Sequence, residues 1–131
     1  MKKLKQNSQK QGIAFISSPY AAVIRHIQDR QYANQFIKSY ARFGCKKALD
    51  NQFVPFSPVL TFEGIFDENQ RDLIMQHCFE IISKSQVLYV VKTGYFHLSS
   101  GMQDEIAYAK SLNLPIMEIE FLSKSLNGEI K

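Results

Sequence analysis

Residues 86–91 read QVLYVV, and this run decides the fold class of the chain. Residues 87–91 are five consecutive apolar side chains, and no apolar stretch in the sequence is longer. A membrane-spanning helix needs roughly 20 such residues, so no membrane span is predicted. A short and nearly continuous apolar run is instead typical of a parallel β-strand that is buried on both faces of a sheet.

Strand-like and helix-like patterns alternate on both sides of this run. Residues 12–17 (GIAFIS) form a second buried strand, and residues 115–121 (PIMEIEF) alternate as a half-exposed or edge strand does. Residues 67–83 and 102–112 carry helical periodicity. The alternation predicts an α/β three-layer sandwich, in which helices cover both faces of a mostly parallel, four- to five-stranded sheet of Rossmann- or flavodoxin-like type.

The middle of the chain carries two further segments with less regular boundaries. Apolar residues recur every three or four positions from 29 to 43, and Gly44 stands where a helix would end. Residues 45–51 then form a further turn or a short helix. Pro55 and Pro58 interrupt the stretch FVPFSPVLTF at residues 53–62. Because proline cannot donate to a strand ladder, we expect a short strand there, followed by an irregular loop.

The length and the charge distribution bound the domain organisation. A chain of 131 residues fits one domain, expected at residues 12–122 between a basic tail at 1–11 and a polar tail at 123–131. The net charge of +4 comes from Lys2, Lys3, Lys5 and Lys10, since removing these four from the 16 basic residues leaves 12, against 12 acidic ones. A nucleic-acid-binding domain carries positive charge on its folded face, so nucleic-acid binding is not predicted.

The cysteines and histidines suggest neither a disulfide framework nor a metal centre. Cys45 and Cys78 lack the CxxC spacing and are expected to be free thiols in a reducing compartment. His26, His77 and His97 form no metal-ligand spacing with them, so no metal and no cofactor is predicted. The basic start is not followed by the apolar segment of a signal peptide, and we expect a cytoplasmic protein.

Two loops are placed to bind a ligand. Residues 17–20 follow the first strand, and residues 93–101 follow QVLYVV. Ligands of open parallel sheets bind beyond the carboxyl ends of the strands, where both loops would lie. Both loops are rich in serine or glycine and poor in charge. Their backbone N–H groups and hydroxyls would suit an anion or a sugar.

The stretch SSGMQDEIAYA at residues 99–109 opens the last predicted helix. Ser100 is a candidate N-cap, with Gln103 completing a capping box. The unpaired N–H groups of a helix N-terminus attract phosphate, and Gly101 would let a ligand approach the backbone closely. Glu105 would then lie in the second turn, near any bound anion. The same pattern is also typical of ordinary helix capping.

The pattern S-x-G-M-x-x-E-I-A-Y-A resembles the active-site signature of the nucleoside 2-deoxyribosyltransferase-like superfamily. This superfamily includes nucleoside deoxyribosyltransferases and deoxynucleoside 5′-monophosphate N-glycosidases. Across residues ~12–121 the chain resembles a poorly characterised bacterial and phage branch. The other similar stretches are ISSPY at 16–20, FVPFSPVLTF at 53–62, and the helix at 67–83 with QVLYVV.

The resemblance implies a role for each matching residue. Glu105 would be the nucleophile that attacks the anomeric carbon of a nucleoside or nucleotide and displaces the base. Ser99 would bind a 5′-phosphate or a 5′-hydroxyl, and Ser17 and Ser18 would line the nucleotide pocket. The remaining residues of the two loops complete the expected substrate-binding set, namely Tyr20, Ser100, Gly101 and Met102. A homodimer or a larger homo-oligomer is also implied.

The chain departs from the superfamily at two positions. The better-known enzymes carry an Asp on the helix before the third strand, where Cys78 or a near neighbour stands here, and a second Asp where Ser85 or Gln86 stands. Another residue would then protonate the leaving base, with Tyr20, His97 and Asp67 as candidates by loop position, or the site binds without turnover.

Three functions remain open on this basis. The first is an N-glycosidase or deoxyribosyltransferase. The second is a non-catalytic module that binds a nucleotide or an NAD derivative as a sensor or scavenger. The third is a structural domain that pairs through its aromatic loops. Tyr95, Phe96 and His97 could stack on a base, cover the sheet edge or form a subunit contact.

Overall fold

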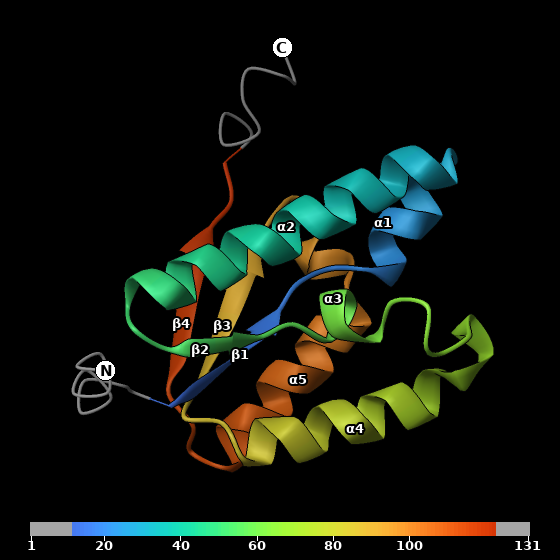
Figure 1. Cartoon of the computed structure of the whole chain (residues 1–131). Coiled ribbons are helices and arrows are strands. Elements are labelled where there is room, and N and C mark those ends of the chain that lie inside the picture. Colours follow the sequence, from blue (N-terminus) through green and yellow to red (C-terminus); the bar gives the residue numbers. More distant parts are fainter. Residues whose placement is uncertain (1–11, 123–131) are drawn as a thin grey trace, which may run out of the picture.

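The computed structural model describes residues 12–122 as a parallel sheet between two layers of helices (Figure 1). The four strands lie in the order β2-β1-β3-β4 and all pair in parallel. This confirms the expected α/β three-layer fold, with four strands. Their bounds are β1 Ile13–Ser17, β2 Val54–Phe56, β3 Val87–Lys92 and β4 Ile116–Glu120.

Strand β3 is central and buried on both faces, as its sequence predicts. Val87 through Val91 are all at most 5% exposed. Leu88 and Val90 point to one face, while Val87, Tyr89 and Val91 pack on the other. β4 is an edge strand with mixed exposure, which confirms the half-exposed pattern. β1 pairs with β3 so that Ser17 is level with Val90.

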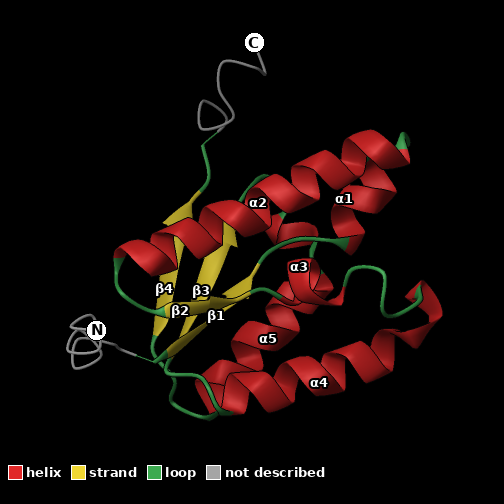
Figure 2. Ribbon diagram, viewed as in Figure 1, coloured by secondary structure: helices red, strands yellow, loops and turns green. Residues whose placement is uncertain are grey.

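Helix α2 (Arg30–Asp50) covers one face of the sheet as a single 21-residue helix, so the expected end at Gly44 is wrong (Figure 2). A Cβ at Gly44 would lie 2.6 Å from Ile16 Cγ2 and 2.8 Å from Val91 Cγ2. Gly44 therefore permits close contact between helix and sheet rather than a C-terminal turn. The left-handed backbone that follows the helix belongs to Gln52, whose φ is 68°.

Helices α4 (Arg71–Ser83) and α5 (Ser100–Ser111) cover the opposite face. The helical periodicity of residues 67–83 predicts α4, but only part of its periodic positions are buried: Cys78 and Ile82 are buried, while Leu73 is 39% exposed and His77 is exposed. The buried core on this side is formed by Phe15, Leu88 and Val90 of the sheet with Cys78, Ile82, Met102 and Ala109 of the helices.

Four short elements were not expected as such. Helix α1 (Ala21–His26) follows β1, and helix α3 (Pro58–Phe62) replaces the irregular loop expected after β2. Ser57 caps α3 by accepting a hydrogen bond from the Leu60 N–H at 3.2 Å, and Pro58 occupies the first helical turn, where its missing N–H costs nothing. Two 3₁₀ turns, η2 (Glu68–Gln70) and η3 (Phe96–Leu98), precede α4 and α5.

The tails at 1–11 and 123–131 lie outside the described residues, and so does the basic charge assigned to the first of them. Within residues 12–122 no helix is long and apolar enough to cross a membrane. Cys45 and Cys78 are free thiols, as expected.

Candidate functional site

A cavity lies where the chain leaves the two central strands in opposite directions. After β1 the chain crosses one face through α2 and reaches β2, whereas after β3 it crosses the other face through α5 and reaches β4. The loops beyond these strands therefore diverge, which is the usual position of a ligand site in an open parallel sheet. The cavity holds about 570 Å³, within the common range for small-molecule sites.

The carboxylate of Glu105 lies on the wall of this cavity and is almost fully buried. Its side chain is 7% exposed, and the Ser17 hydroxyl donates a 2.6 Å hydrogen bond to Oε1 across 88 positions of sequence. The Cys78 thiol donates a second hydrogen bond to the same carboxylate. β1, α4 and α5 thus each contribute one member of this cluster.

Burial changes the protonation of Glu105 and Cys78 in the same direction. Desolvation raises the pKa of Glu105 to about 7, although the hydrogen bonds from Ser17 and Cys78 and the positive charge of Arg71 oppose the shift. Desolvation and the nearby Glu105 raise the pKa of the Cys78 thiol to about 12. Near neutral pH, Glu105 is therefore present in both its protonated and its ionised form, while Cys78 stays a neutral donor.

The N-terminus of α5 forms another part of the cavity wall. Ser99, rather than the expected Ser100, is the N-cap, and its hydroxyl accepts a hydrogen bond from the Met102 N–H at 3.3 Å. The Gln103 side chain donates to the Phe96 carbonyl at 3.1 Å, so the expected capping box is absent. Ser100 is free of capping, and its hydroxyl accepts a 3.3 Å hydrogen bond from Arg71 Nη2.

The fold brings the predicted site residues together. Seven of them line the one cavity, namely Ser18, Tyr20, Ser99, Ser100, Gly101, Met102 and Glu105, and Ser17 reaches it through its hydrogen bond. Cys78 also lines it, at the position where the resemblance places an acid. Gln86 lies elsewhere, at the amino end of β3, where its side chain accepts a hydrogen bond from the Ile13 N–H.

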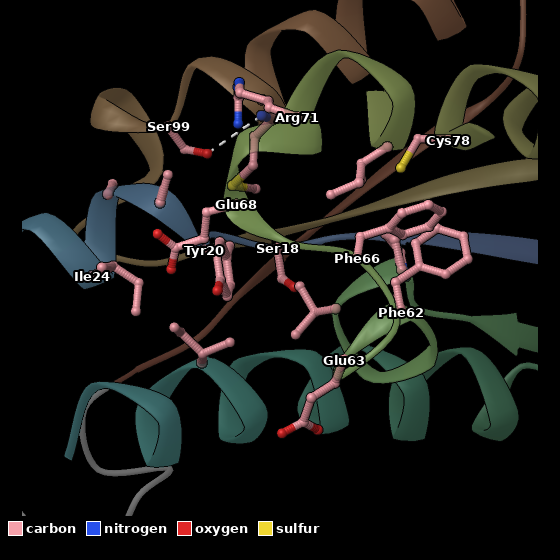
Figure 3. A pocket seen from close by; sticks show the side chains of 18 of the residues that line it. Ser18, Tyr20, Ile24, Phe62, Glu63, Phe66, Glu68, Arg71, Cys78 and Ser99 are labelled. Atoms are coloured by element: carbon pink, nitrogen blue, oxygen red, sulfur yellow. Dashed lines mark hydrogen bonds between the residues drawn. The ribbon is translucent and has the colours of Figure 1, made fainter. Parts of the chain in front are cut away.

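The aromatic residues of the cavity are not those that the sequence singled out. Phe62 and Phe66 line it, with their ring centroids 5.3 Å apart and edge to face. In Figure 3 these two rings lie on one side of the cavity and Arg71 with Ser99 on another. Tyr95, Phe96 and His97 do not line it; Tyr95 packs against Tyr40 of α2 instead, and Phe96 packs on the core beneath α5.

The structure distinguishes between the three candidate proton donors by their position relative to the cavity. Tyr20 and Asp67 line the cavity, whereas His97 does not. Partial burial and the charge of Glu68 raise the pKa of the Tyr20 phenol, which makes it a weaker acid. Asp67 is the N-cap of η2, and its backbone N–H donates a 2.8 Å hydrogen bond to the Gln70 side-chain oxygen.

Two ion pairs join α2 to the segment between α3 and α4 at the cavity wall. Arg30 contacts Glu68 and Lys38 contacts Glu63, each with a nitrogen–oxygen distance of 3.0 Å. Both pairs are largely exposed, so each contributes little to stability. In the part of the chain that the structure describes, no three His, Cys, Asp or Glu side chains gather to hold a metal ion.

The fold and the site define a Rossmann-like α/β protein with a cavity at the switch point of its sheet. Residues 12–119 match the family described as Domain of unknown function (DUF7768), and the chain belongs to that family. A search of the curated proteins found no match.

Proposed function

We propose that the protein cleaves or transfers the N-glycosidic bond of a nucleoside or nucleotide, with Glu105 as the nucleophile. The observation that carries this proposal is a buried carboxylate on the wall of a nucleotide-sized cavity, held by hydrogen bonds from Ser17 and Cys78. The resemblance of residues 99–109 to the deoxyribosyltransferase-like signature supports the same role for Glu105.

The chemistry begins with the ionised form of Glu105. A carboxylate oxygen forms a bond to the anomeric carbon while the carbon–nitrogen bond to the base breaks, and the base leaves with the electron pair. The result is a glycosyl ester of Glu105, which water or a second base resolves. Ser17 fixes Oε1 at 2.6 Å, which limits rotation of the attacking group. The departing base takes up a proton, for which Tyr20 and Asp67 are the candidates that line the cavity.

A second function has one specific observation in its favour. The residue that contacts Glu105 from α4 is a thiol with a pKa of about 12, not a carboxyl group. A general acid contributes about 10²–10⁴ in rate, so its replacement would favour binding over turnover. In that case the same cavity would hold a nucleotide or an NAD derivative as a sensor or scavenger.

The test incubates the protein with a panel of nucleosides, their 5′-monophosphates and NAD, and measures the free base by chromatography. Wild type would be compared with Glu105→Gln, which keeps the shape of the side chain but removes its charge. Glu120→Gln is the matched control, because Glu120 is exposed on β4 and does not line the cavity. We expect Glu105→Gln to lower the rate by more than about a thousandfold.

The alternatives give different results. If no compound of the panel releases free base but one of them raises the melting temperature, the protein is a binding module and not an enzyme. No release of base and no change in melting temperature with any compound would contradict both functions. Equal rates in wild type and Glu105→Gln would remove Glu105 from the mechanism even if base is released.

A further inference from the structure

Four cationic side chains line the cavity, and they fall into two pairs. Arg30 and Lys38 form ion pairs with Glu68 and Glu63, so their charge is compensated. Arg25 and Arg71 form no ion pair within residues 12–122. No carboxylate of the described residues holds either guanidinium group at ion-pair distance, although the charge of Arg71 also lowers the pKa of Glu105.

The guanidinium groups of Arg25 and Arg71 bind the same short segment from different elements. Arg25 of α1 donates from Nη2 to the Leu98 carbonyl, and Arg71, the first residue of α4, donates from Nη2 to the Ser100 hydroxyl. Each of these donor–acceptor distances is 3.3 Å. The two acceptor residues are two positions apart, so their Cα atoms are at most about 7.6 Å from one another.

The segment that both arginines hold, residues 98–100, leads from η3 into α5, and the start of that helix adds to their positive potential. The first residues of this 12-residue helix line the same cavity, and the N-terminal end of a helix carries a positive partial charge. Gly101 keeps the approach open, since a Cβ there would lie 3.4 Å from Arg71 Nη2. Ser18 Oγ, another atom of the cavity lining, is buried without a hydrogen-bond partner in the described part of the chain.

Ser99 is not available for the same task. Its side chain is 6% exposed, and its hydroxyl is engaged as the N-cap of α5. A role for Ser99 in binding the 5′ substituent is what the sequence resemblance implies, but the exposed polar groups here are those of Arg25, Arg71 and Ser100.

We propose that Arg25 and Arg71 together bind a phosphate group of the ligand at the start of α5, so that the protein selects a phosphorylated nucleotide over the free nucleoside. Guanidinium groups match phosphate oxygens with paired, charge-assisted hydrogen bonds. The aromatic rings of Phe62 and Phe66 then lie at another part of the cavity, where they suit the base. The nucleotide identity of this ligand rests on the proposed function.

The experiment measures binding by calorimetry in the Glu105→Gln background, where turnover does not interfere. The ligands are inorganic phosphate and matched pairs of nucleosides and their 5′-monophosphates, ribose and deoxyribose forms of each. We expect at least one monophosphate to bind ten- to a hundredfold tighter than its nucleoside, and the preference to fall by about tenfold or more in Arg25→Gln and in Arg71→Gln. Arg71→Lys keeps the charge but loses the planar, forked guanidinium group, so this variant should lose part of the preference for the monophosphate.

Arg42→Gln is the control, because Arg42 is an exposed arginine of α2 that does not line the cavity. It should keep the full preference, and thermal melting of all variants verifies that each is folded. Equal affinity for nucleoside and monophosphate, a preference that survives the double variant Arg25→Gln/Arg71→Gln, or no binding of any compound would each overturn the proposal.

The proposal and the proposed function fail in different ways. If wild type releases base with the same kcat/KM from nucleosides and monophosphates, the result contradicts the phosphate site but supports the enzymatic function. If the protein binds monophosphates selectively but releases no base, the result contradicts the enzymatic function but supports the phosphate site.

Discussion

Replacing Glu105 by glutamine is expected to change how the stability of the protein depends on pH. In the folded state, desolvation raises the pKa of this carboxyl from its ordinary value of 4.5 to about 7. Between these two values the folded protein holds a proton at Glu105 that the unfolded chain has released. Unfolding in this range therefore releases a proton, and the free energy of unfolding falls as the pH rises.

The magnitude follows from the same two values. Each unit of pKa corresponds to about 1.4 kcal/mol, so ionising Glu105 in its buried position costs the folded state about 3 kcal/mol by the time the pH passes 7. This contribution to stability is fully present below pH 4.5 and is lost as the pH rises through about 7. Glutamine cannot ionise, so Glu105→Gln escapes the loss.

The assay is urea denaturation of wild type and Glu105→Gln at several values of pH from 4.5 to 8. The stability of the variant relative to wild type should rise by about 3 kcal/mol across this range. A constant offset from altered hydrogen bonds to Ser17 and Cys78 cancels, because only the change with pH is read. Glu120→Gln, an exposed control, should show no such slope. A flat difference for Glu105→Gln would refute the desolvation of the carboxylate.

Three further predictions use other contacts of the site and the core. Cys78→Ala removes a hydrogen bond that favours the charged form of Glu105, so the acid limb of the pH profile of kcat/KM should move to higher pH, whereas Cys78→Ser should restore it. Gly44→Ala should destabilise the protein in urea by about 1–3 kcal/mol, although alanine favours helices, because its Cβ meets the sheet. Burial raises the pKa of both Cys45 and Cys78, so a thiol reagent should modify them far more slowly in native than in urea-unfolded protein; equal rates would contradict their burial.

The strands were predictable because their signal is local. The apolar run at residues 87–91 and the alternation at 115–121 report directly how many faces of each strand are covered. The parallel order and the two helix layers follow from the alternation of elements, which places the carboxyl ends of all the parallel strands at one edge of the sheet. Together with the resemblance of residues 99–109 to the deoxyribosyltransferase-like signature, this placed Ser17 and Glu105 in one site, and the structure joins them by a hydrogen bond.

The predictions that the structure corrected rest on sequence patterns with two possible physical causes. A glycine after a helical pattern indicates either a helix end or a close approach, and only the packing of Gly44 on Ile16 and Val91 identifies the second cause. Ser99 and Ser100 both suit an N-cap, and the choice depends on where the 3₁₀ turn before them ends. Arg25 and Arg71 had no sequence signal at all, since their common position arises from the contact of α1 and α4 with the start of α5.

The strongest argument for function at Glu105 comes from a conflict between its position and its chemistry. Met102, Glu105 and Ala109 are the buried residues of α5, and their spacing places them on one helix face. Met102 and Ala109 pack in the apolar core, so an aliphatic side chain between them would suit folding better than a carboxylate that resists ionisation. Two hydrogen-bond donors from distant elements nonetheless converge on this one carboxylate, and a cavity opens beside it. A sequence that otherwise agrees with its fold departs from it at this residue, and sites of function are where such departures are expected.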